Sequence, residues 1–202
     1  MNKKIVHDAL ILTTFTLVLG LILAVVYGIT KAPIDAANLE AKQEAYKAVF
    51  DDAASFETQE YDEDAANSMV SEAGYNDTIN DVESALDANG ETLGYVITVT
   101  AKDGSQGSIT FSVGIQNDGT VNGYSITDIS ETPGLGMKAE EVLKPQFAEK
   151  NVGQFTYTKT GAMASDEIDA ISGATITTNA LVNGVNAGLE CFKNELGGGV
   201  NE

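Results

Sequence analysis

A run of 22 residues without a charged side chain, ALILTTFTLVLGLILAVVYGIT, occupies positions 9–30. As an α-helix this run would be about 33 Å long, which is enough to cross the hydrocarbon core of a bilayer. It is longer than the apolar core of a cleaved signal peptide, and the sequence that follows, Thr30-Lys31-Ala32-Pro33, is a poor cleavage site. A helix buried in a soluble core is rarely apolar on every face over this length. We therefore expect a transmembrane helix over residues 9–30.

The charges on the two sides of this run differ in sign. Residues 1–8 carry Lys3, Lys4 and Asp8, whereas residues 31–202 hold 9 Lys and 29 acidic side chains, a balance of −20. Lysines that flank a transmembrane helix stay on the cytoplasmic side of the membrane. We therefore expect a single-pass protein of the cell membrane, with residues 1–8 as a cytoplasmic stub and the acidic remainder outside the cytoplasm.

The composition excludes several classes of function. The chain has 11 Lys, no Arg and 30 acidic residues, and a net charge of −19 opposes binding to nucleic acid or to anionic lipid headgroups. One His, His7, and one Cys, Cys191, cannot form a usual zinc site or a Cys/His catalytic pair. We therefore expect no nucleic-acid partner, no metal and no catalytic side chain. Cys191 is interpreted as a small packing residue.

Residues 31–78 are interpreted as a helical and acidic connector. Pro33 and Asp35 can start a new helix that continues to Phe50, because apolar residues recur there at near-helical spacing. Residues 51–66, DDAASFETQEYDEDAA, contain seven acids and little apolar periodicity. We interpret this stretch as a solvated connector or a loose helix and assign it no metal.

From residue 79 the pattern changes to short strands separated by turns. Three segments alternate in side-chain polarity and predict antiparallel strands: 93–99, 109–115 and 121–129. Gly-bearing turns stand before or after them at 87–90, 102–104 and 117–119. The pattern then predicts a helix over 139–150, a strand over 155–158 and a final helix that opens after 169–175. Leu181, Val185, Leu189, Phe192 and Leu196 give that final helix an apolar stripe suited to packing on a sheet.

The predicted fold class is therefore α+β. A single N-terminal transmembrane helix precedes an antiparallel sheet with packed helices, which we place at 79–196 and which ends in a tail at 197–202.

Two segments could carry chemistry, and each is open to two interpretations. The residues from Ser172 to Thr178 are rich in hydroxyls before a helix, so they can cap it or leave its N–H groups to an anion. The segment Glu131-Thr132-Pro133-Gly134-Leu135-Gly136 is a tight Pro-Gly turn, or a loop that lets a flat ligand approach the backbone. Glu131 is as consistent with a brace of this loop as with a ligand contact.

The two segments together resemble a known family. The sequence DAISGAT at 169–175 matches the Asp-x-x-Ser/Thr-Gly-Ala-Thr flavinylation pattern, and ETPGLG lies about forty residues before Thr175. This order resembles the FMN-binding domain of the Rnf-complex G subunit, which is related to the C subunit of the sodium-translocating NADH:quinone reductase. The resemblance covers the N-terminal span, the strands that lead to ETPGLG, and the stretch from Ile168 to Glu190.

The resemblance implies a cofactor and its binding residues. Thr175 would carry FMN through a phosphoester bond, made from FAD by a separate flavin transferase that releases AMP. The transferase would recognise Asp169, Ser172, Gly173, Ala174 and Thr175. Ser172, Gly173 and Ala174 would also bind the cofactor, and the FMN ring would contact a second set of residues in the upstream loop, namely Thr132, Gly134 and Leu135.

The same resemblance implies a function. The chain would be the FMN-carrying electron-transfer subunit of the membrane-bound Rnf complex, which couples ferredoxin:NAD+ oxidoreduction to Na+ or H+ translocation. It would act with the other subunits and perform no independent catalysis. Two alternatives remain: the C subunit of the quinone reductase or another anchored flavin carrier outside the cytoplasm, and a noncatalytic membrane-anchored surface domain.

Overall fold

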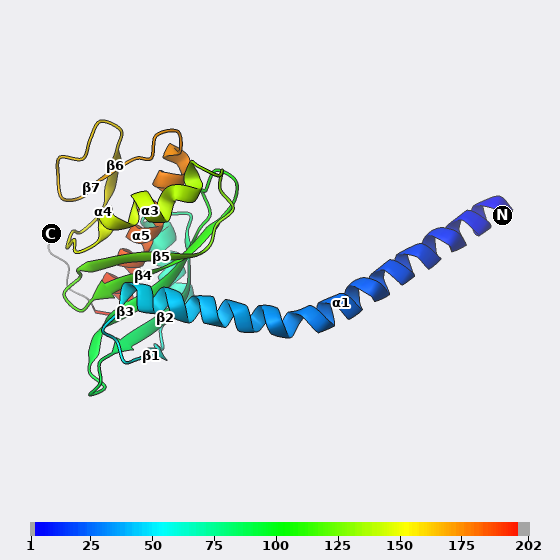
Figure 1. The fold of residues 1–202 in the computed structure, drawn as a ribbon, viewed down its shortest axis with the longest axis horizontal. Coiled ribbons are helices and arrows are strands. Elements are labelled where there is room, and N and C mark those ends of the chain that lie inside the picture. The colour runs from blue at the N-terminus through cyan, green and yellow to red at the C-terminus, as the bar shows by residue number, and fades with distance from the viewer. Residues whose placement is uncertain (1–2, 198–202) are drawn as a thin grey trace. The chain divides into compact units, whose positions relative to one another are not determined.

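The computed structural model describes residues 3–197. The chain divides into two compact units between residues 41 and 42, so the described residues fall into 3–41 and 42–197. The first unit is one helix without tertiary packing, because its large apolar side chains are exposed along its whole length. This segment belongs to α1 (Lys3–Val49), which is long and apolar enough to cross a membrane. The predicted span at 9–30 lies inside α1. The prediction of a new helix at Pro33 is wrong, because α1 continues through that residue (Figure 1).

The second unit is built on a five-stranded antiparallel sheet in the order β1-β2-β3-β4-β5. The strands have these bounds: β1 (Ser55–Thr58), β2 (Thr78–Leu86), β3 (Thr92–Ala101), β4 (Ile109–Gln116) and β5 (Val121–Asp128). The three predicted strands correspond to β3, β4 and β5. Gly90 and Gly119 adopt φ values of +82° and +88° in the hairpin turns, so glycine stands where the backbone is left-handed. This confirms the antiparallel part of the prediction.

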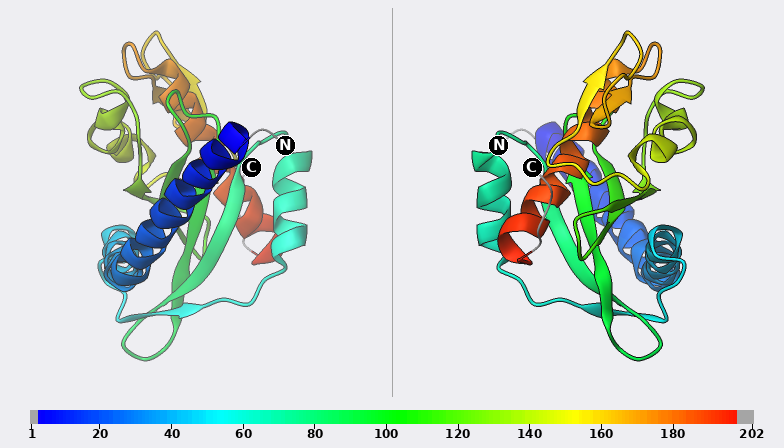
Figure 2. Two further views of the ribbon diagram at one scale, coloured as in Figure 1. Left: turned by 90° about the vertical axis from the view of Figure 1, so that its right-hand side faces the viewer. Right: turned by 90° about the vertical axis from the view of Figure 1, so that its left-hand side faces the viewer.

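Helices cover one face of the sheet, and the base of α1 packs on the other (Figure 2). On the first face, α5 (Thr175–Glu195) contacts β3 and β4, and α2 (Glu63–Glu72) packs against α5 and β2. The predicted apolar stripe of α5 lies in this core, and Cys191 is a buried free thiol within it. On the second face, Tyr46 and Val49 of α1 and the next residue, Phe50, form a smaller cluster with Ala85 and Val96.

The acidic stretch 51–66 does not remain a loose connector. Residues 55–58 are the edge strand β1, which pairs with β2, and Glu63 starts α2. The Asp62 carboxylate caps α2 by accepting the Ala65 N–H at 3.0 Å. Only Ala66 and Val70 of α2 are fully buried, so its apolar periodicity is too weak to read among so many acids.

The segment between β5 and α5 is broken into short elements. The helix predicted over 139–150 is instead η1 (Gly136–Lys138), α3 (Ala139–Val142) and α4 (Lys144–Phe147). Pro145 lies in the first turn of α4, where its missing N–H is tolerated, but it cannot continue a helix from α3. The strand predicted over 155–158 is β6 (Thr156–Thr158), which pairs in parallel with β7 (Glu167–Asp169).

Candidate functional site

The two segments singled out by the sequence lie against each other. The turn that follows β5 and the start of α5 enclose a recess of about 260 Å³. Its lining comes from three parts of the chain: Ser105; Glu131, Thr132, Leu135 and Gly136; and Gly173, Ala174, Thr175, Ile176 and Thr177. The recess therefore joins residues that are 26 to 72 positions apart in the sequence.

The first wall is a tight turn. The Thr132 carbonyl accepts the N–H groups of Leu135 at 3.1 Å and Met137 at 3.3 Å, and Gly134 has a φ of +78°. The Leu135 side chain then lies over Gly173, because a Cβ added at Gly173 would be 3.2 Å from Leu135 Cδ2. Of the three ring contacts expected here, Thr132 and Leu135 line the recess, and Gly134 is an exposed residue of the same turn.

The second wall is the N-terminus of α5, which no side chain caps. The N-cap position is Ala174, and Thr175 is the first helical residue, partly exposed to solvent. Thr178 Oγ1 accepts the Ile171 N–H at 3.1 Å and donates to the Ala174 carbonyl at 3.0 Å, so it is engaged elsewhere. The first N–H groups of a helix lack intrahelical partners and carry the positive end of its dipole. This helix end can therefore bind an anion.

Of the residues expected near the start of α5, some line the recess and others do not. Gly173, Ala174 and Thr175 line the recess, whereas Ser172 is exposed beside it and is not the helix cap. Asp169 lies further away in β7, where its Oδ1 accepts the Ala162 N–H at 2.7 Å.

Four lining residues were not expected from the sequence: Ser105, Gly136, Ile176 and Thr177. Thr177 continues the hydroxyl-rich run, and Gly136 completes the ETPGLG segment, so both carried a signal. Ser105 carried none, because it reaches the recess through a contact with Glu131 that spans 26 residues.

Asp77 is a buried carboxylate just before β2, and it contacts the backbone of Lys102, at the start of the loop that brings Ser105 to the recess. It is 6% exposed, its Oδ2 has no hydrogen-bond partner, and the Lys102 backbone N–H and the charges of Asp103 and Lys102 act on it. Burial, which disfavours the charged form, raises the pKa of Asp77 to about 6, while the Lys102 N–H opposes the rise.

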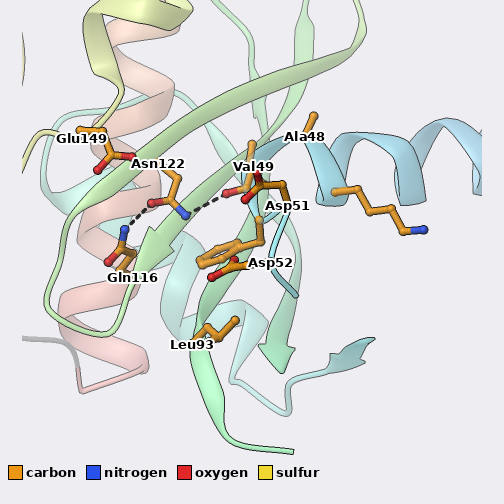
Figure 3. Close-up of a pocket in the computed structure, with 10 residues that line it drawn as sticks. Ala48, Val49, Asp51, Asp52, Leu93, Gln116, Asn122 and Glu149 are labelled. Atoms are coloured by element: carbon orange, nitrogen blue, oxygen red, sulfur yellow. Dashed lines mark hydrogen bonds between the residues drawn. The ribbon is translucent and has the colours of Figure 1, made fainter. Parts of the chain in front are cut away.

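A larger cavity of about 490 Å³ lies at the base of α1, on the other face of the sheet (Figure 3). Asn122 Nδ2 donates to the Val49 carbonyl at 2.8 Å, and Gln116 Nε2 donates to Asn122 Oδ1 at 2.6 Å. Asp51, Asp52 and Glu149 also line this cavity. In the described part of the chain, no three His, Cys, Asp or Glu side chains gather closely enough to hold a metal ion. This cavity therefore marks where α1 joins the sheet.

The recess at α5 fits a phosphate-anchored flavin. Its volume of about 260 Å³ is below the roughly 300–1,000 Å³ of pockets that bury a small molecule, so a flavin ring would remain partly exposed. Leu135 and Ile176 line the recess and are 39% and 60% exposed, which gives a flat apolar ring surfaces to contact. The uncapped N–H groups suit the phosphate.

Comparison with known proteins identifies the family. Residues 1–49 match the RnfG N-terminal region, and residues 104–190 match the FMN-binding domain. The G subunit of the Na+-translocating ferredoxin:NAD+ oxidoreductase complex of Acetobacterium woodii is 31% identical over 195 residues, covering 95% of this chain and 93% of that protein. The chain belongs to the RnfG family.

Two further comparisons accompany this assignment. The G subunit of the ion-translocating oxidoreductase complex of Methanosarcina acetivorans is 29% identical over 194 residues, covering 94% of this chain and 95% of that protein. The crystal structure of Shewanella oneidensis NqrC is 21% identical with a TM-score of 0.46, covering 55% of this chain and 57% of that one. In this member of the RnfG family, all the residues that line the recess lie within residues 104–190, which match the FMN-binding domain.

Proposed function

We propose that this protein is the membrane-anchored electron-transfer subunit of an Rnf-type complex and carries FMN in a phosphoester bond to Thr175. The complex would couple ferredoxin:NAD+ oxidoreduction to Na+ or H+ translocation, as the name of the Acetobacterium woodii relative describes for sodium. One observation carries the proposal. Thr175 is the first residue of an uncapped helix that opens on a recess within the FMN-binding match.

The attachment step balances without further reactants. The Thr175 hydroxyl oxygen displaces AMP from the pyrophosphate of FAD, its proton is released, and a phosphodiester joins Thr175 to the flavin. A separate flavin transferase catalyses this step and recognises the segment from Asp169 to Thr175. Once bound, FMN supplies the electron-transfer chemistry, and the protein supplies position, burial and local charge.

A covalent bond suits the small size of the recess. Because the recess encloses only part of a flavin, noncovalent contacts would retain it weakly, and a ligand lost outside the cytoplasm is diluted. A tethered flavin instead stays at a fixed effective concentration near its partners. The exposed ring edge then lets electrons pass to and from neighbouring subunits, so the chain needs no catalytic acid, base or nucleophile.

The anchor sets the orientation in this proposal. Residues 9–30 cross the bilayer, Lys3 and Lys4 keep the N-terminus in the cytoplasm, and the acidic domain lies outside. Its partners are the other membrane and redox subunits of the complex, and the transferase during maturation.

The proposal is tested by producing the full-length chain together with a flavin transferase and denaturing it in detergent. We expect flavin absorbance that stays with the denatured chain, and its loss in Thr175→Val, which replaces the hydroxyl by a methyl group of similar size. Thr156→Val on exposed β6 is the matched control and should keep the flavin. A chain without flavin, or a Thr175→Val variant that keeps it, would favour a noncatalytic surface domain or another attachment residue.

A further inference from the structure

Glu131 is a buried carboxylate that connects all three parts of the recess. It is 6% exposed, and its Oε1 accepts the N–H groups of Ser105 at 2.6 Å and Gln106 at 3.2 Å. Its Oε2 accepts the hydroxyl of Thr177 at 3.0 Å, in the first turn of α5. These bonds fix the loop that carries Ser105 and the start of α5 relative to the turn that Glu131 begins.

Two glycines leave room for this carboxylate. A Cβ added at Gly136 would lie 2.8 Å from Glu131 Cβ and 2.9 Å from its Oε2. A Cβ added at Gly104 would lie 3.0 Å from Glu131 Oε1 and would collide with the Gly107 carbonyl. Glycine at positions 104 and 136 therefore leaves the space that the Glu131 side chain occupies.

The oxygens of Glu131 are bonded by backbone N–H groups and a hydroxyl. Among residues 3–197, no Lys or His forms an ion pair with its carboxylate. Acceptance of three donors is the pattern of an ionised carboxylate. A buried charge is screened by salt much less than an exposed one.

We propose that Glu131 is a positioning residue for the bound flavin, which fixes the walls of the recess and lowers the flavin reduction potential through its negative charge. This inference rests on the proposed function. Electrons added to a flavin in the recess are repelled by the Glu131 carboxylate, which itself lines the recess. The same carboxylate offsets part of the positive field at the start of α5 through its bond from Thr177.

The substitution Glu131→Gln separates the charge from the brace. The amide oxygen can still accept the N–H groups of Ser105 and Gln106, and the amide nitrogen can donate to Thr177 Oγ1. Spectroelectrochemical titration of the loaded full-length chain should therefore show a higher midpoint potential in Glu131→Gln. Glu57→Gln, which neutralises an exposed carboxylate on edge strand β1, should leave the midpoint where it is in the wild type.

The brace is tested without flavin. In the unloaded chain, Glu131→Ala should speed hydrogen exchange at the Ser105 and Gln106 amides at least tenfold, and Glu131→Gln should leave most of their protection. Unchanged exchange in Glu131→Ala would overturn the positioning role.

The spectroelectrochemical titration measures only protein molecules that carry flavin, so a lower degree of flavinylation does not change the midpoint potential that it gives. A midpoint in Glu131→Gln equal to that of the wild type would overturn the effect on potential, and so would complete loss of loading in this isosteric variant. A wild-type chain that never acquires flavin would instead contradict the proposed function.

Discussion

The C-terminus of α1 and the N-terminus of α5 are both helix ends that pack at the sheet, but they are finished in different ways. At the end of α1, Asn122 donates to the Val49 carbonyl, and Gln116 holds the Asn122 amide in place. At the start of α5, the N-cap residue Ala174 makes no side-chain bond, and the helix opens on a recess. The last carbonyl of α1 is bonded by a side chain of the protein, and the first N–H groups of α5 have no side-chain cap and can bind an anion.

This contrast supports our proposal that the recess at α5, and not the cavity at the base of α1, holds the cofactor. The cavity at the base of α1 is larger, about 490 Å³ against about 260 Å³. Its helix end presents carbonyl groups, and Asn122 donates to that of Val49, whereas the smaller recess has helix N–H groups that no side chain caps. Volume alone would favour the cavity at the base of α1, and the uncapped helix N-terminus is our reason for proposing the smaller recess instead.

The largest effect should come from filling the space beside either helix end. In Gly136→Ala the new Cβ would lie 2.8 Å from Thr177 Oγ1 and Glu131 Cβ, and in Gly114→Ala it would lie 2.8 Å from Val49 Cβ. We expect each to lower the free energy of unfolding by about 1–3 kcal/mol. Only Gly136→Ala should reduce flavin loading, by at least tenfold. Equal flavin loading in the two variants, measured as flavin absorbance per chain, would contradict the claim that only the start of α5 takes part in flavin binding.

A second effect depends on pH and probes the loop behind the recess. Because the pKa of Asp77 is raised to about 6 in the folded chain, against about 3.9 unfolded, the folded state binds the proton more tightly. The contribution of Asp77 to stability is therefore present below about pH 4 and is lost as the pH rises to about 6. The free energy of unfolding of Asp77→Asn, relative to that of the wild type, should therefore rise by about 2–3 kcal/mol between pH 4 and pH 7. Denaturant unfolding of both proteins at the two pH values checks this, and a constant difference would contradict it.

A smaller effect is expected where α1 joins the sheet. Asn122→Ala removes the bond to the Val49 carbonyl and leaves Gln116 Nε2 without its partner, so unfolding should require about 1–2 kcal/mol less. Flavin loading should not change, because this end has no part in the recess. Chemical denaturation and flavin absorbance of the same sample measure both quantities, and a loss of flavin here would mean that the two ends are coupled.

The smallest effect is expected at Ser172. This residue is exposed and does not cap α5, so Ser172→Ala should change the stability of the unloaded chain by less than about 0.5 kcal/mol. A decrease of about 1 kcal/mol in the free energy of unfolding, typical of a removed N-cap, would show that the Ser172 side chain caps α5.

The sequence predicted the elements whose signal is local. Alternation and Gly-bearing turns located β3, β4 and β5, and the apolar stripe located α5. The prediction failed where distant packing decides the structure. Phe56 packs on the cluster at the base of α1, which turns an acidic stretch into β1, and Pro33 stands in a helix that continues past it.

The candidate site divides in the same way. Thr132, Leu135, Gly173, Ala174 and Thr175 were predicted from two short motifs, and all five line the recess. The motifs could not show that Glu131 joins Ser105 and Thr177, because those bonds span 26 and 46 residues. Nor could they place the N-cap at Ala174 in preference to Ser172, since both interpretations fit a hydroxyl-rich helix start.

Site mapping of the flavin tests the central claim most directly. Lys159 and Lys193 enclose one tryptic peptide, which contains Ser172, Thr175, Thr177 and Thr178. Tandem mass spectrometry of this peptide from the flavinylated full-length chain should place the mass of one FMN, less water, on Thr175 alone. An adduct on Ser172, Thr177 or Thr178, or a peptide without adduct, would contradict attachment at the uncapped start of α5.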